Sequence, residues 1–147
     1  MQARQPATLP SRAAIRLDRL AMFFMSFPVV CFTLALATDV LYWRTSFLMW
    51  HDFSAWLLFA GALGGGLALL TGVVSLFFRP RVRPVAYWLG VVVVMILGVL
   101  NNFVHAGDGW TAIVPRGLGL SAATVLALMV TGWLGRPAAT EGAYRHV

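Results

Sequence analysis

The sequence has few charged residues and no lysine, so every cationic residue other than histidine is an arginine. Charged residues make up 11% of its 147 residues, whereas soluble domains carry about 25%. So few charged groups cannot cover the surface of a protein in water. Lipid must therefore be the solvent for much of the chain, and no stretch remains for a sizeable soluble module.

Cysteine is almost absent as well, since Cys31 stands alone inside an apolar run. A single cysteine excludes a disulfide within the chain, a C-x-x-C-H haem attachment and an iron–sulfur site held by cysteines. The motifs G-x-S-x-G, H-E-x-x-H and the P-loop are missing too. A haem b held by two histidines needs them inside facing spans, and we place His51, His105 and His146 outside the span interiors. We therefore expect neither a cofactor nor a catalytic site.

Hydrophobic residues are abundant, at 60% of the chain with a mean hydropathy of +0.81. They form four runs long enough to cross a bilayer, at about residues 20–43, 53–78, 84–105 and 117–135. An open sheet cannot satisfy its backbone in lipid, so the runs must be helices. The sequence predicts an all-α integral membrane four-helix bundle over residues 20–135.

The flanking segments are short. We expect residues 1–19 to be a tail that contains a short basic helix, with Arg12, Arg16 and Arg19 at the lipid headgroups. Residues 136–147 form a second tail. A signal peptide cleaved after Ala35-Leu36-Ala37 is an alternative, but the apolar run is longer than the 7–15 residues usual for such peptides. We expect the first span to be retained.

The arginines are distributed unevenly between the two sides of the membrane. One side receives Arg4, Arg12, Arg16, Arg19, Arg79, Arg81, Arg83, Arg136 and Arg145, and the other receives Arg44 and Arg116. Because cytoplasmic loops of membrane proteins are enriched in arginine, we expect both termini in the cytoplasm. Short basic segments between spans are not the clustered basic face of a nucleic-acid-binding domain, so we expect no nucleic-acid partner.

Small residues recur at helical spacing in two spans. They are Gly61, Gly65 and Gly72 in the second span and Gly119, Ala123 and Ala127 in the fourth. Membrane helices associate through such faces because they allow close backbone approach. We interpret them as helix-packing residues within the bundle, and a face for a second copy or a partner membrane protein is the alternative.

Polar residues gather at the span ends that should face outward. They are Asp39, His51, Asn101, Asn102, His105 and Asp108. Ionisable residues at membrane depth are costly and are often functional. We interpret this set first as wet helix ends and loops. The alternatives are a quinone headgroup site, a partner-binding site, and a divalent metal held by the two histidines with a carboxylate.

The chain resembles the DUF2231 family of predicted bacterial membrane proteins. The matching stretches are S-F-P-V-V-C-F-T-L-A-L-A-T-D-V-L-Y (Ser26 to Tyr42), W-L-L-F-A-G-A-L-G-G-G-L-A-L-L-T-G (Trp56 to Gly72), V-T-G-W-L-G (Val130 to Gly135) and Y-R-H (Tyr144 to His146). The resemblance implies a four-span bundle in the bacterial cytoplasmic membrane and no particular activity. Many relatives carry a His-Pro pair just before the Phe-Pro of the first span, where this chain reads Ala21-Met22-Phe23-Phe24-Met25. Any cofactor held there in relatives would be absent here.

For function we expect a non-catalytic accessory or structural subunit of a larger membrane complex, with a respiratory or redox complex as one candidate. Its partners would be the lipid bilayer and either a second copy or another membrane protein. An alternative is an electron-transfer or quinone-interacting protein with a site around Asp39, Asn102 and His105. A transporter component is the weakest alternative, because we expect no charge near the middle of a span.

Overall fold

The computed structural model describes residues 12–76, 84–107 and 113–136, and every regular element within them is helical. In chain order the elements are α1 (Arg12–Thr45), α2 (Leu48–Leu76), α3 (Val85–Ala106), η1 (Ile113–Gly117) and α4 (Leu118–Leu134). Four helices, the last including most of η1, are long and apolar enough to cross a membrane. The expected all-helical architecture with four spans is therefore confirmed.

The first helix is longer than the first apolar run. α1 is unbroken from Arg12 to Thr45 and passes through Pro28 in its interior. The short basic helix expected before the first span is therefore the first turns of α1 itself. In lipid no water is available to satisfy a broken backbone, which favours continuing the helix through the proline.

The link between the first two helices is shorter than the expected loop from Arg44 to Asp52. α2 begins at Leu48, which leaves Ser46 and Phe47 as the whole connection. Ser46 has a φ of 54°, the left-handed conformation that reverses the chain direction here. As a result, His51 and Asp52 lie in the first turns of α2 rather than in a loop.

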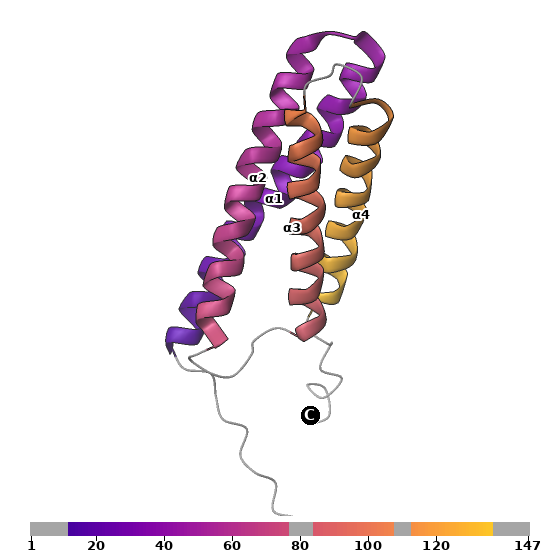
Figure 1. The fold of residues 1–147 in the computed structure, drawn as a ribbon. Coiled ribbons are helices and arrows are strands. Elements are labelled where there is room, and N and C mark those ends of the chain that lie inside the picture. The colour runs from indigo at the N-terminus through magenta and orange to yellow at the C-terminus, as the bar shows by residue number, and fades with distance from the viewer. Residues whose placement is uncertain (1–11, 77–83, 108–112, 137–147) are drawn as a thin grey trace, which may run out of the picture.

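The helices form a closed bundle in which each one packs against two neighbours. α1 contacts α2 and α4, and α3 contacts α2 and α4. The chain direction alternates from helix to helix, as Figure 1 shows. The end of the bundle that holds the α1–α2 link, here called the turn end, therefore also holds the end of α3 and the start of α4. The opposite end holds the start of α1 and the end of α4, and is here called the basic end.

Each helix turns one line of buried residues inward, and along that line the spacing alternates between four and three. The line comprises Ala21, Met25, Pro28, Phe32, Ala35 and Asp39 in α1; Ser54, Leu58, Gly61, Gly65, Ala68 and Gly72 in α2; Tyr87, Val91, Val94, Gly98, Asn101 and His105 in α3; and Gly117, Ser121, Thr124, Leu128, Thr131 and Gly135 along α4. A mean spacing of 3.5 residues is that of left-handed helix bundles. At the turn end this line becomes polar in all four helices.

The glycines of α2 allow close contact with its neighbours. A Cβ atom added at Gly61 would lie 2.5 Å from the Phe32 ring of α1. Cβ atoms at Gly65 and Gly72 would overlap with side chains of α3, Met95 and Trp88 respectively. All three glycines lie on the buried line of α2, where the small-residue pattern placed them.

The small residues expected to pack in α4 lie differently, and the expectation for Gly119 is wrong. This glycine is exposed, and a Cβ atom there would meet nothing within 4 Å. Ala123 and Ala127 are only half-buried. Residues spaced by four drift away from a line whose mean spacing is 3.5. The buried line of α4 runs instead through Ser121, Thr124, Leu128 and Thr131.

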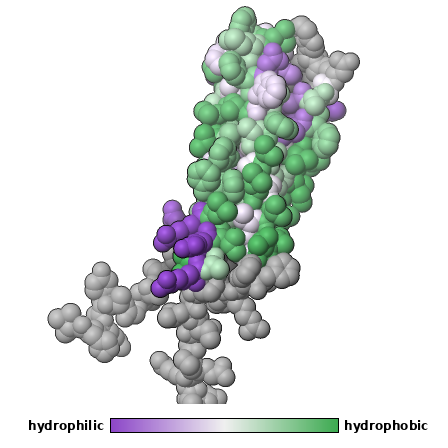
Figure 2. Space-filling view, turned by 90° about the vertical axis from the view of Figure 1, so that its left-hand side faces the viewer, coloured by the Kyte–Doolittle hydropathy of each residue, from purple (hydrophilic) through white to green (hydrophobic). Residues whose placement is uncertain are grey.

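The outer surface is suited to lipid. Figure 2 shows a broad apolar belt between hydrophilic groups at the two ends of the bundle. Large hydrophobic side chains point outward from every membrane helix, and Trp56, Phe103 and Trp133 are 72%, 71% and 67% exposed. The basic end carries Arg12, Arg16, Arg19 and Arg136, and the turn end carries Arg44 and Arg116. The predicted topology arginines Arg79, Arg81 and Arg83 lie outside the described residues.

Candidate functional site

The turn end encloses a carboxylate that contacts every helix of the bundle. Asp39 of α1 is fully buried. Its Oδ1 accepts a hydrogen bond from Ser54 of α2 and lies 3.0 Å from Nε2 of His105 of α3. Its Oδ2 accepts a hydrogen bond of 2.5 Å from Ser121 Oγ of α4. A buried charge is tolerated when it is paired and fully hydrogen-bonded, and this arrangement meets that requirement.

A second layer of polar groups supports these contacts. Asn101 Nδ2 donates to Ser121 Oγ at 2.7 Å, so a chain of hydrogen bonds points toward the Asp39 carboxylate. Thr38 Oγ1 lies 3.0 Å from Ser54 Oγ. We refer to Asp39, Ser54, Asn101, His105 and Ser121 as the Asp39 cluster. Within it the buried Asn101 Oδ1 has no hydrogen-bond partner, so one acceptor of the cluster is unsatisfied.

The two ring nitrogens of His105 have different partners. Nδ1 lies 3.0 Å from the backbone oxygen of Asn101, and Nε2 faces Asp39. A carbonyl oxygen can only accept, so Nδ1 must carry a hydrogen. Gly117 lies against the ring edge, and a Cβ atom there would be 2.9 Å from Cε1 of His105. The imidazole is therefore held in one orientation from both sides.

A line of ring and carboxylate groups leads from the cluster to the surface. The His51 ring of α2 lies beside His105, with 6.0 Å between ring centroids. His51 Nδ1 is 3.4 Å from Oδ1 of Asp52, whose side chain is 76% exposed. Tyr42 of α1 flanks His51 at a centroid distance of 6.3 Å. His51, which is 22% exposed, thus lies between the buried pair and an exposed carboxylate.

The structure brings together only part of the polar set predicted from the sequence. Asp39, Asn101 and His105 belong to the cluster, and His51 lies beside it. His105 is buried between the helices at the end of α3. Asn102 turns away from the cluster and donates to the backbone oxygen of Gly98. Asp108 lies outside the described residues.

The sequence reasoning missed two members of the cluster, Ser54 and Ser121. Each is one short polar residue in a long apolar run, which alone carries little signal. Their spacing was the available signal, because Ser54 precedes Leu58 and Ser121 precedes Thr124 on the buried lines. A heptad register drawn through the spans would have placed both on the inward lines of their helices.

The described residues hold no group of three or more histidine, cysteine or acidic side chains that could bind a metal ion. His51, His105 and a carboxylate, which were considered as a metal site, therefore do not form such a group there. Both nitrogens of His105 are already engaged, so iron or another metal would have to displace Asp39 or the Asn101 carbonyl. The chemistry that the cluster offers is hydrogen bonding and proton transfer.

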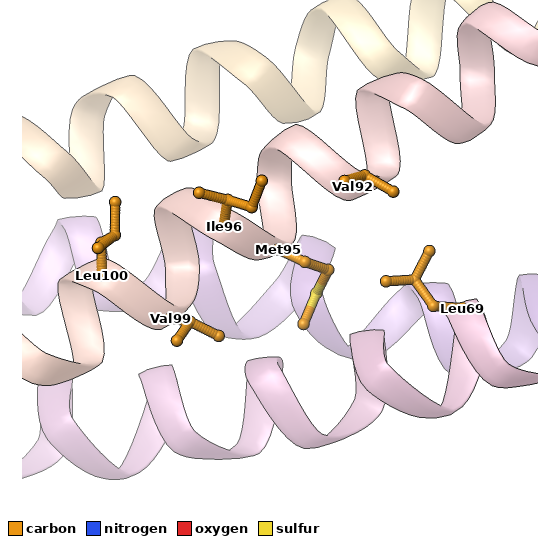
Figure 3. A pocket seen from close by; sticks show the side chains of 6 residues that line it. All are labelled: Leu69, Val92, Met95, Ile96, Val99 and Leu100. Atoms are coloured by element: carbon orange, nitrogen blue, oxygen red, sulfur yellow. The ribbon is translucent and has the colours of Figure 1, made fainter.

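Away from the cluster, the surface has an apolar hollow between α2 and α3. It has a volume of about 330 Å³ and is shown in Figure 3. Its lining residues are Leu69, Val92, Met95, Ile96, Val99 and Leu100. Because none of these is polar and the hollow opens onto the apolar belt, lipid acyl chains suffice to fill it.

Four apolar helices closed by a polar cluster at one end define a polytopic α-helical membrane protein. The family model described as "Predicted membrane protein (DUF2231)" matches residues 23–146. The chain therefore belongs to the DUF2231 family, and the resemblance found in the sequence is confirmed. Comparisons with curated proteins and with solved structures find no match.

Proposed function

We propose that this protein is a non-catalytic accessory or structural subunit of a larger assembly in the bacterial cytoplasmic membrane. The observation that carries the proposal is the closed Asp39 cluster, in which donors from the other three helices meet one carboxylate. Such a cluster fixes the register of the helices at the turn end. The space between the helices at the described cluster is filled by the chain's own side chains and is not open to a substrate.

The exposed aromatic residues near the turn end support the same role. Trp43, Phe47, Phe53 and Trp56 are each at least half exposed, and Phe103 of α3 is 71% exposed. Aromatic side chains are enriched both at membrane interfaces and in protein contacts. A rigid bundle with such a rim is suited to pack against a second copy or against another membrane protein.

Co-purification tests this proposal. We expect the protein, extracted from its native membrane in lipid nanodiscs formed by an amphipathic polymer, to appear by native mass spectrometry in a complex of fixed stoichiometry. The partner would be a second copy or another membrane subunit. Replacing Trp56 and Phe103 with alanine should weaken that complex while the bundle stays folded, since both side chains are exposed. A monomer at every concentration would contradict the proposal.

A quinone-interacting or electron-transfer protein is the second candidate. The buried histidine–carboxylate pair favours it, because quinone chemistry couples electrons to protons. The burial of the pair goes against it, since the Asp39 and His105 side chains have no exposed area and a headgroup could reach them only after the helices part. Quinone in an organic extract of the same nanodiscs, lost in a His51→Phe variant, would reverse this order.

The orientation in the membrane gives a separate prediction. With both termini in the cytoplasm, an alkaline phosphatase fused in the α1–α2 link at Ser46 should be active, because it would reach the periplasm. A fusion at Arg81, between α2 and α3, should be inactive, and a green fluorescent protein there should fluoresce. The excess of arginine at the basic end supports this orientation. Phosphatase activity at Arg81 would show that the orientation is reversed.

A further inference from the structure

We propose that Asp39 and His105 form a site that binds one exchangeable proton and reaches outer water through His51 and Asp52. The inference does not depend on the accessory role, because it concerns the chemistry of the cluster alone. It rests on the hydrogen-bond geometry of the pair and on the line of groups that leads to the surface.

The geometry of the pair fixes how many protons it holds. Nδ1 of His105 carries a hydrogen because it faces the Asn101 carbonyl oxygen. The 3.0 Å contact between Nε2 and Asp39 Oδ1 needs one hydrogen between the two atoms. That proton lies on Nε2, giving an imidazolium and a carboxylate, or on Oδ1, giving a neutral pair of groups. Both forms have no net charge, which suits an enclosed position in a membrane.

Removing that proton changes the electrostatics of the turn end. The Nε2 lone pair would then face a carboxylate oxygen, and the cluster would carry one negative charge. The other described ionisable groups at the turn end are Tyr42 and Arg44 on α1, His51 and Asp52 on α2, and Arg116 on η1. The two arginines are exposed, so water screens their effect on the buried charge. We therefore expect proton loss to weaken the contact between α1 and α3.

His51 is the connection to water. Its Nδ1 faces the exposed Asp52 carboxylate, and its ring lies beside His105. An imidazole can accept a proton at one ring nitrogen while it releases one from the other, which makes histidine a proton shuttle. In uptake, a proton passes from water or Asp52 to His51 Nδ1, and the proton on His51 Nε2 passes through a water molecule to the Asp39–His105 pair, because His105 Nε2 is directed at Asp39 and the two rings share no direct hydrogen bond. No electron transfer or co-reactant is required.

Infrared spectroscopy of the full-length protein in lipid nanodiscs tests the binding step. Isotope-labelled aspartate identifies carboxyl bands without altering the chain. Between about pH 4 and pH 10, a range that extends to both sides of ordinary histidine titration, we expect a coupled change in one carboxyl band and one imidazole band. Both changes should disappear in Asp39→Asn. Spectra with no coupled change that depends on Asp39 would overturn the proposal.

A pH jump tests the route, and it uses a variant at the edge of the bundle. His51→Phe keeps a ring beside His105 but removes the shuttle nitrogens. We expect the coupled bands to keep their pH midpoint while relaxing more slowly by on the order of 10²-fold, the lower end of what positioned proton-transfer groups contribute. Added imidazole should restore the rate, which a structural defect would not allow. Tyr42→Phe, a matched control, should relax at the wild-type rate, and an unchanged rate in His51→Phe would overturn the route.

Discussion

Replacing Asp39 with leucine is expected to lower the free energy of unfolding by about 3 kcal/mol, the loss typical when one partner of a buried pair is removed. The change leaves His105, Ser54 and Ser121 without their shared acceptor in a region where water cannot replace it. Reversible unfolding in mixed detergent micelles, followed by helical circular dichroism, measures the difference.

Two further variants separate the cluster from a general effect of lost charge. Asp52→Leu removes a carboxylate at the same end of the bundle, but that side chain is 76% exposed, so we expect a change within about 0.5 kcal/mol. The loss of unfolding free energy in Asp39→Asn should fall between those of the two leucine variants, because asparagine keeps the side-chain volume of Asp39 and its amide oxygen can still accept from the serines. Equal losses for Asp39→Leu and Asp52→Leu would show that the cluster does not hold the helices together.

Replacing Gly64 with alanine is expected to destabilise the protein by about 2 kcal/mol, within the range for overpacking a close contact. A Cβ atom at this buried position would overlap with Cβ of Phe27 and lie 3.3 Å from the backbone oxygen of Phe24. Atoms so near the α1 backbone cannot move aside by a change of rotamer. The two helices would have to separate, and thermal unfolding in detergent measures the cost.

Gly66 provides the matched control, two residues along the same helix. It is exposed, and a Cβ atom there would meet nothing within 4 Å. Gly66→Ala should therefore stabilise α2 by up to about 1 kcal/mol, because alanine has the higher helix propensity. If both variants shift the midpoint in the same direction, close packing of α1 on α2 is not what constrains Gly64.

Much of the architecture follows from the sequence because the solvent imposes it. Four long apolar runs in so uncharged a chain admit only spanning helices, and the structure contains them. The position of the first link was harder to predict. Aromatic and polar residues around Phe47 resemble an interfacial loop, yet a left-handed Ser46 lets α2 start directly afterwards. That two-residue link is what carries His51 onto the side of His105.

The candidate site was only partly predictable, because the identity of a polar residue does not say which face of its helix it lies on. Asn101 and Asn102 are equivalent as letters, but successive helical residues point about 100° apart. Only Asn101 lies on the inward line of α3, while Asn102 bonds to its own helix. A single serine is an even weaker signal of a buried polar site than asparagine. Ser54 and Ser121 can be recognised only when the spacing of four and three shows that they lie on the inward lines of their helices, as Asp39 does.

The Asp39 cluster also sets an order of events during biogenesis. Ser54 follows Asp39 by only 15 residues, whereas His105 and Ser121 follow by 66 and 82. At the usual speed of synthesis, His105 is made roughly 3 to 13 s after Asp39. Until then the carboxyl group must rely on the serine and on polar groups at the end of α1, which lies at Thr45, about 9 Å away along the helix axis. The hairpin of α1 and α2 therefore holds only part of the cluster at first, and α3 and α4 complete the cluster when they are inserted.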